Sequence, residues 1–155
     1  MQRQRNRIED VLRRIPLHVD LLDATHEHLD LIGALYAVLD DTKIRGVRGT
    51  TLSKVLHRKR PMLIPLYDSH VFAVYCGDGA HPVPHARKQT WREFMTLLAG
   101  AMQADLARAP LAWDTIRASA PDGDMTRLRA LDVLAWKLAP NSRVTSSTDD
   151  ISGDV

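Results

Sequence analysis

Hydrophobic residues recur along this chain at intervals of three and four positions, the spacing of one face of an α-helix. The pattern is clear over residues 25–40, where Leu29, Ile32, Leu35 and Leu39 follow it. No run of alternating hydrophobic and polar residues predicts a strand, so the expected fold class is all-α. The other helices are predicted at 6–15, 50–59, 69–76, 91–108, 113–118 and 125–138.

Capping and helix-breaking residues set the ends of these helices. Thr25 and Asp124 are expected to cap helix N-termini, and the segment from Thr90 to Glu93 has the residues of a capping box. Pro61 ends the helix that precedes it. The three tryptophans stand at apolar helix positions and are expected in the core; they are Trp91, Trp113 and Trp136.

The length of 155 residues fits one compact helical domain, which we place at residues 1–140. The polar stretch 141–155 is predicted to be a disordered tail. No segment approaches the roughly 20 apolar residues of a membrane span, and the first residues do not form a signal peptide. With a single cysteine, Cys76, the chain has no internal disulfide, and we expect a cytoplasmic protein without a membrane partner. The sequence does not indicate an oligomeric state.

Charge is distributed unevenly. Between Lys43 and Arg60 there are seven lysines and arginines and no acid, whereas the other residues carry 21 − 7 = 14 basic against 19 acidic side chains. A basic block on an otherwise acidic protein is typical of a site for a polyanion. The alternative is a solvated helix face without a ligand.

The basic block contains a glycine-marked turn before a predicted helix, a combination suited to phosphate. Glycine allows a positive φ and lets backbone N–H groups approach a phosphate, and the helix N-terminus adds the positive end of its dipole. We therefore predict backbone contacts to duplex DNA, which position a protein without reading sequence. The predicted contact residues are Gly46, Arg48, Gly49, Thr50, Thr51, Lys54, Arg58 and Arg60.

The segment from Gly46 to Asp68 resembles the helix-hairpin-helix DNA glycosylase superfamily of the endonuclease III type. Those proteins carry a leucine-proline-glycine-valine-glycine hairpin, a helix, a proline-containing connector, and then valine-aspartate-threonine-histidine-valine. This chain reads IRGVR over 44–48 and LYDSHV over 66–71, with the family's separation from the first hairpin glycine to the aspartate. The resemblance covers roughly residues 30–75, and residues 54–71 are also similar to a bacterial family of uncharacterised function.

The resemblance implies that Asp68 is the catalytic carboxylate of a DNA glycosylase. A carboxylate beside C1′ stabilises the positive charge that develops on the sugar as the N-glycosidic bond breaks, and it orients a water molecule. The base must first leave the duplex. Tyr67 and His70 would then line the pocket. The simpler interpretation makes Asp68 a helix N-cap, Tyr67 a core residue and His70 structural.

The sequence departs from the family pattern in ways that restrict the activity. Thr50 stands where bifunctional members have a lysine that forms a Schiff base, so we expect a monofunctional enzyme, and Arg48 replaces the second hairpin glycine. No cofactor is predicted. No metal site is predicted either, because His26 and His28 diverge on a helix of 3.6 residues per turn. The alternatives are a catalytically inert nucleic-acid-binding module and a helical protein-interaction domain.

Overall fold

A computed structural model of the chain describes residues 2–41, 48–76, 81–84, 88–121 and 125–138. These residues form α-helices and two short 3-10 helices, which confirms the predicted all-α class. The predicted hairpin residues 42–47, with Gly46, lie outside the described residues, as does the predicted tail 141–155. The elements are α1 (Gln2–Arg14), η1 (Leu21–Asp23), α2 (His26–Tyr36), η2 (Ala37–Asp40), α3 (Gly49–Lys59), α4 (Ser69–Tyr75), α5 (Trp91–Arg108), α6 (Pro110–Ala118) and α7 (Arg127–Leu138).

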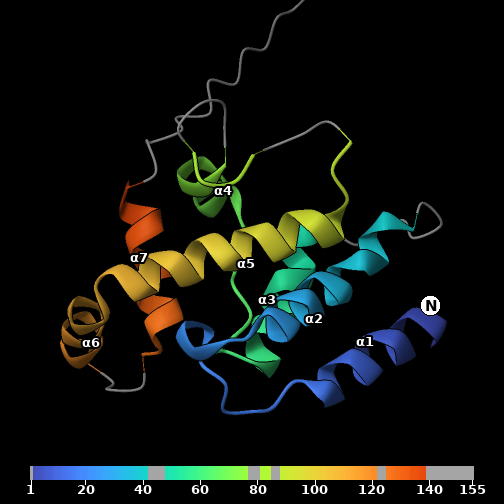
Figure 1. Cartoon of the computed structure of the whole chain (residues 1–155), viewed down its shortest axis with the longest axis horizontal. Coiled ribbons are helices and arrows are strands. Elements are labelled where there is room, and N and C mark those ends of the chain that lie inside the picture. The colour runs from blue at the N-terminus through green and yellow to red at the C-terminus, as the bar shows by residue number, and fades with distance from the viewer. Residues whose placement is uncertain (1, 42–47, 77–80, 85–87, 122–124, 139–155) are drawn as a thin grey trace, which may run out of the picture.

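The long helix α5 runs through the middle of the molecule, and the other helices pack around it (Figure 1). Its most extensive contact is with α2. The two helices approach closely at Gly33, where an added Cβ would lie 2.1 Å from Thr96 Oγ1. Helix α1 packs on α2, α6 and α7 pack on each other and on α5, and α4 packs on α7. The fully buried residues Ile32, Leu35 and Leu98 show that the core lies between α2 and α5.

Most predicted helix ends are confirmed. Thr25 and Thr90 each form a capping box at the start of α2 and α5. The prediction for the last helix was wrong in its start: α7 begins at Arg127, and the Thr126 hydroxyl accepts the Arg129 N–H at 3.0 Å. Asp124 lies outside the described residues. Helix α6 begins at Pro110, since proline fits the first turn of a helix, where its missing N–H has no partner to lose.

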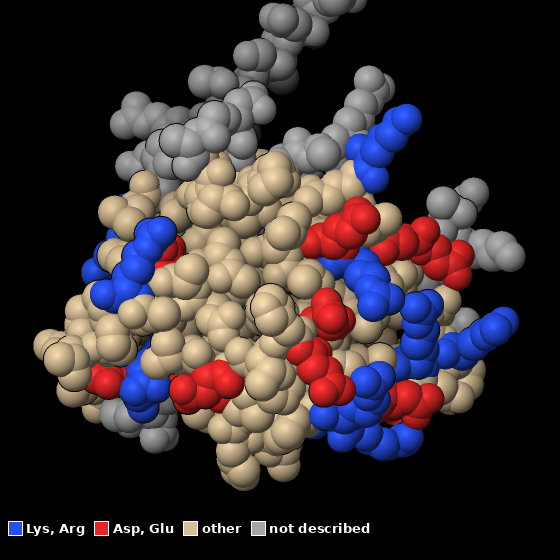
Figure 2. Space-filling model, in the orientation of Figure 1, with Lys and Arg blue, Asp and Glu red and all other residues tan. Residues whose placement is uncertain are grey.

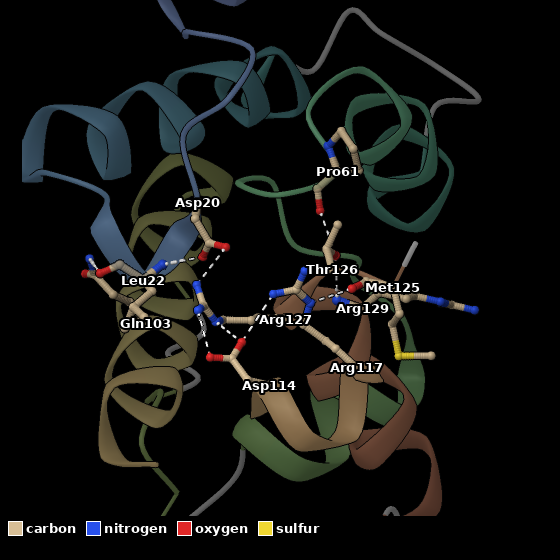
Figure 3. A network of polar contacts seen from close by, with 10 residues as sticks. All are labelled: Asp20, Leu22, Pro61, Gln103, Asp114, Arg117, Met125, Thr126, Arg127 and Arg129. Atoms are coloured by element: carbon tan, nitrogen blue, oxygen red, sulfur yellow. Dashed lines mark hydrogen bonds and ion pairs between the residues drawn. The ribbon is translucent and has the colours of Figure 1, made fainter. Parts of the chain in front are cut away.

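The start of α7 is fastened by Arg127, which joins three parts of the chain (Figure 3). Its Nε and Nη2 atoms donate to the two carboxylate oxygens of Asp114, on α6, at 2.9 and 3.0 Å, and its Nη1 lies 3.5 Å from Asp20 Oδ2. Arg117 adds a bond to Asp114 and another to the Met125 carbonyl. We call Asp20, Asp114 and Arg127 the clasp.

The tryptophans differ in burial from what their spacing predicts. Trp113 is buried, and Trp91 packs partly buried against the core. Trp136 is 59% exposed, so its expected place in the core was wrong. Leu138, two residues further on and expected on the inward face, is also exposed. The last turns of α7 therefore extend beyond the core that the helix covers at Leu128 and Leu131.

No helix in the part of the chain that the structure describes combines the length and apolar character of a membrane span.

Candidate functional site

Asp68 is held at the start of α4 by the backbone. Its Oδ1 atom accepts the N–H groups of His70 and Val71, both at 2.9 Å, so the predicted N-cap is confirmed. The side chain keeps 26% of its surface exposed, and its Oδ1 lies 3.8 Å from His70 Nδ1. Two N–H donors fix the orientation of the carboxylate, and the start of a helix favours negative charge.

The capping carboxylate also lines a cavity. The cavity has a volume of about 420 Å³, within the range of ligand sites. Helix α3, the connector before α4, and α7 supply its wall; α3 and α7 pass behind α5 in the view of Figure 1. The lining residues are Lys54, Leu66, Tyr67, Asp68, Arg129, Asp132, Val133, Trp136 and Lys137. The structure thus places Asp68 beside an open space as well as in a helix cap.

Basic side chains lie where α3 meets this cavity. Lys54 lines the cavity, and Thr51 and Arg58 are exposed one turn before and after it on the same face of α3. Arg48 precedes the helix, is exposed, and makes no side-chain bond that caps it. The first N–H groups of α3, which include that of Thr50, therefore have no side-chain acceptor from the capping residue. This face has the features of the phosphate-contacting surface that the sequence predicts.

Two of the predicted contact residues have roles in the fold. Gly49 is buried under the Trp91 indole, where an added Cβ would lie 2.3 Å from the ring. Arg60 donates from Nε and Nη2 to the carbonyls of Ile15 and Leu12, just after and within the last turn of α1, at 3.0 and 2.7 Å. We therefore leave Gly49 and the Arg60 guanidinium out of the proposed interface.

Helix α1 is rich in arginine, and part of its positive charge is paired. Arg5 pairs with Glu9 at 2.9 Å, and Arg13 pairs with Asp10 at 2.6 Å. Figure 2 shows acidic and basic side chains next to one another on this side of the molecule. The helix nevertheless carries five arginines against two acids, so it remains basic.

Tyr67 and His70 combine the two roles that the sequence left open. Tyr67 lines the cavity and also meets the rings of Trp91 and Phe94 edge-on, at centroid distances of 5.6 and 5.4 Å. Burial raises the pKa of its phenol above the ordinary value. His70 does not line the cavity, but it stacks on Trp136 with ring centroids 4.2 Å apart. His70 thereby supports one of the residues that do line it.

Helix α7 supplies the part of the site that sequence reasoning missed. Arg129, Asp132 and Trp136 lie three and four residues apart, so they share one face of the helix. Asp132 is only 5% exposed, and it forms an ion pair with Arg129. Burial is the main cause that raises the pKa of Asp132, and the nearby carboxylate of Asp68 adds to it. The sequence does contain a signal for this part of the site: Arg129 and Asp132 are charged residues that directly follow the core residues Leu128 and Leu131.

Within the described residues, the other reactive side chains do not form a second site. The buried thiol of Cys76 has its pKa raised to about 11 by desolvation, so it is a poor nucleophile at neutral pH. The ring of His57 is bound to the Ile64 carbonyl at 2.7 Å. In the described ranges no group of three or more His, Cys, Asp or Glu could hold a metal ion.

The arrangement combines an oriented carboxylate, a second carboxylate, three cationic side chains and an exposed aromatic ring around one space. Lys54 and Lys137 add positive charge to the lining, and Arg129 adds a further cation that is paired with Asp132. Asp68 is placed to stabilise positive charge or to orient water next to a bound group. Trp136 offers a surface on which a planar ring can stack.

The chain belongs to a protein family of unknown function (DUF6308), whose family model matches residues 1–139. This match spans every residue that lines the cavity. No curated protein matches the chain, and no solved structure does. Since the family carries no assigned activity, the function has to be argued from the site itself.

Proposed function

We propose that this protein binds duplex DNA through α3 as a helix-hairpin-helix protein, and that it acts as a monofunctional DNA glycosylase that hydrolyses an N-glycosidic bond with Asp68. The observation that carries the proposal is that Asp68, oriented by two backbone N–H groups, lies in the wall of a cavity lined by Lys54 and Arg129. This is the position at which the resemblance to the glycosylase superfamily puts the catalytic carboxylate.

Hydrolysis of the N-glycosidic bond requires the protein to position the sugar and to supply a negative charge beside it. A base that has left the duplex occupies the cavity, and its sugar lies next to Asp68. As the C1′–N bond breaks, its electron pair goes to the base, and the carboxylate stabilises the positive charge on the sugar. A water molecule then adds to C1′, its proton passes to Asp68 and from there to solvent, and the departed base takes up a proton from solvent. Thr50 carries no amine, which agrees with hydrolysis rather than Schiff-base chemistry.

The test is base release from duplexes that each carry one lesion: uracil, an alkylated purine or oxidised guanine, with an abasic duplex as the reference for complete cleavage in alkali. Strand breaks are read after alkali for the wild type, Asp68→Asn, and Asp30→Asn, which changes an exposed carboxylate on α2. Asparagine also caps helices well, so Asp68→Asn should keep the fold. We expect release to fall at least 100-fold in Asp68→Asn and to be unchanged in Asp30→Asn. Equal release by all three proteins would contradict the catalytic role.

A second candidate function is DNA binding without chemistry, favoured by the exposed basic face of α3. In both cases the affinity should fall log-linearly with salt, by about one power for each phosphate contacted. Lys54→Ala and Arg58→Ala should each lower that slope by about one, whereas Arg108→Ala, at the far end of α5, should not. Salt-dependent binding by a protein that releases no base from any duplex would favour the inert module. An unchanged slope in the α3 variants would remove α3 from the interface.

A further inference from the structure

The cavity contains a carboxylate whose hydrogen-bonding capacity is not used up by the described residues. Asp132 is 5% exposed, and one of its oxygens, Oδ2, is held by Arg129. The other oxygen, Oδ1, is buried and accepts no hydrogen bond from any residue in the described part of the chain. Asp68 lies close enough to raise the pKa of Asp132, and it donates nothing while ionised.

A buried acceptor without a donor is costly, more so when it is charged. Buried polar groups in native proteins are paired in the great majority of cases, and the exceptions call for an explanation such as a catalytic role or a donor from outside the chain. Replacing Asp132 by an apolar residue would remove this cost. A hydrogen-bond donor on a bound ligand would also remove this cost. Asp132 would then favour ligands that carry such a donor over ligands that do not.

The indole of Trp136 in the cavity wall indicates a ligand with a planar ring. Trp136 lies one helical turn beyond Asp132 on α7 and lines the same cavity, with 59% of its surface exposed. His70 stacks on this indole at 4.2 Å and an interplanar angle of 30°, which fixes the orientation of the ring. A planar ring that stacks on Trp136 would bring its edge towards the helix face that carries Asp132.

We infer that the cavity takes a nucleobase that carries an exocyclic amino group, with Trp136 stacking on the ring and Asp132 accepting an amino N–H. The inference rests on the proposed function, which makes the ligand a base. It adds the class of base: adenine, cytosine or guanine derivatives that keep the amino group, rather than bases without one. Asp132 is then the residue that determines specificity, and Asp68 remains the carboxylate that acts at the sugar.

The test compares two bases that differ only in this group, adenine and unsubstituted purine. Their affinities for the full chain are measured by equilibrium dialysis. We expect adenine to bind about tenfold more tightly or better, because one hydrogen bond to a charged group has that effect. Asp132→Leu should bring the two affinities together. Trp136→Ala should weaken both about tenfold and keep their ratio. The control Leu111→Ala, which changes an exposed residue of α6 outside the cavity lining, should change neither the affinities nor their ratio.

The ratio of two affinities is insensitive to partial unfolding of a variant, because both bases are measured on the same sample. Equal binding of adenine and purine by the wild type overturns the inference, and so does a preference that survives in Asp132→Leu. Lack of binding of either base overturns it as well.

The same experiments distinguish a failure of this inference from a failure of the proposed function. An adenine preference that depends on Asp132, together with no base release from any duplex, supports the inference and removes the hydrolysis. Release that depends on Asp68 and is unaffected by Asp132→Leu for bases with and without the amino group keeps the hydrolysis and overturns the inference.

Discussion

The first turn and the middle of α7 carry similar charged groups in opposite states of pairing. At its start, Arg127 of the clasp donates to both oxygens of Asp114 and lies near Asp20, whose Oδ1 accepts the Leu22 N–H at 2.9 Å (Figure 3). Five residues on, Asp132 has one oxygen paired with Arg129 and the other without a donor among the described residues. The charged groups of the clasp therefore satisfy one another, whereas Asp132 keeps an oxygen that accepts no hydrogen bond from the described residues.

The difference separates charges that hold the fold from charges that are available to a ligand. A network whose acceptors are satisfied rigidifies the structure, and a partly satisfied one destabilises it unless something else supplies the partner. The same helix therefore anchors α6 with its first turn and exposes the cavity wall with its later turns. Changes at the clasp should cost stability, and changes at the cavity should cost binding.

The largest expected difference is between two tryptophans. Trp113, in α6 next to the clasp, is buried, and its indole N–H donates to the Asp105 carbonyl at 3.2 Å. Trp113→Ala should lower the free energy of unfolding by about 3 kcal/mol. Trp136→Ala should lower it by less than about 1 kcal/mol, because that ring is mostly exposed. Urea unfolding of both variants measures the difference, and equal losses would refute the assignment of Trp136 to a ligand surface.

Next in size is the loss of Arg127. Arg127→Ala leaves the largely buried carboxylate of Asp20 and that of Asp114 without their shared partner. We expect the free energy of unfolding to fall by about 2 kcal/mol, less than for a fully buried pair because the Arg127 side chain is 22% exposed. Arg127→Lys should recover part of this, since lysine restores charge without the two-pronged geometry. A loss below about 0.5 kcal/mol would show that the clasp is only a surface ion pair.

A similar or smaller cost is expected at Gly49, where the predicted hairpin meets the core. Gly49→Ala places a Cβ against the Trp91 ring and should cost about 1–2 kcal/mol through displacement of that ring. Thr51→Ala, two residues on and exposed, should leave stability unchanged and weaken DNA binding. Comparison of the two variants by thermal unfolding and by duplex affinity separates the structural residue from the contact residue. If both variants lost the same stability, the assignment of Gly49 to the fold and of Thr51 to the interface would be wrong.

The sequence predicted the elements of the fold well, because apolar spacing and caps are local signals. Helix α5 begins after the Thr90 capping box and ends at Arg108, as predicted from its residues. The start of α7 was placed wrongly because Asp124 and Thr126 are both good N-caps, and three-dimensional packing decides between them. Trp136 was assigned to the core because an apolar stripe does not show where the core ends.

Only half of the candidate site was accessible from the sequence. Asp68, Tyr67 and Lys54 stand close together in one segment, so a motif could find them. Asp132 reaches the same cavity from α7, over 60 residues further along the chain, and only the packing of α4 on α7 brings it there. A buried acceptor without a donor is likewise a property of the packed structure.

The smallest effect, and the sharpest test of the contrast along α7, is the pH dependence of stability. The hydrogen bond from Arg127 lowers the pKa of Asp114 below its ordinary value, whereas burial raises that of Asp132. A carboxylate with a lowered pKa stabilises the fold above its unfolded pKa of about 3.9, and this contribution is lost as the pH falls through the folded pKa. A carboxylate with a raised pKa destabilises the fold at neutral pH, and this cost disappears as the pH falls through its folded pKa.

Unfolding in urea between about pH 7 and about pH 3 should therefore separate the two variants. Asp114→Asn should be less stable than the wild type at neutral pH, and the gap should close on acidification. Asp132→Asn should show the opposite sign, with its advantage over the wild type shrinking as the pH falls. The slope of each difference curve reports how many protons the folded and unfolded states differ by, and its total change over the pH range reports the size of the pKa shift. If the two difference curves ran parallel, the pKa values of Asp114 and Asp132 would not be shifted in opposite directions, as their hydrogen bonds and burial indicate.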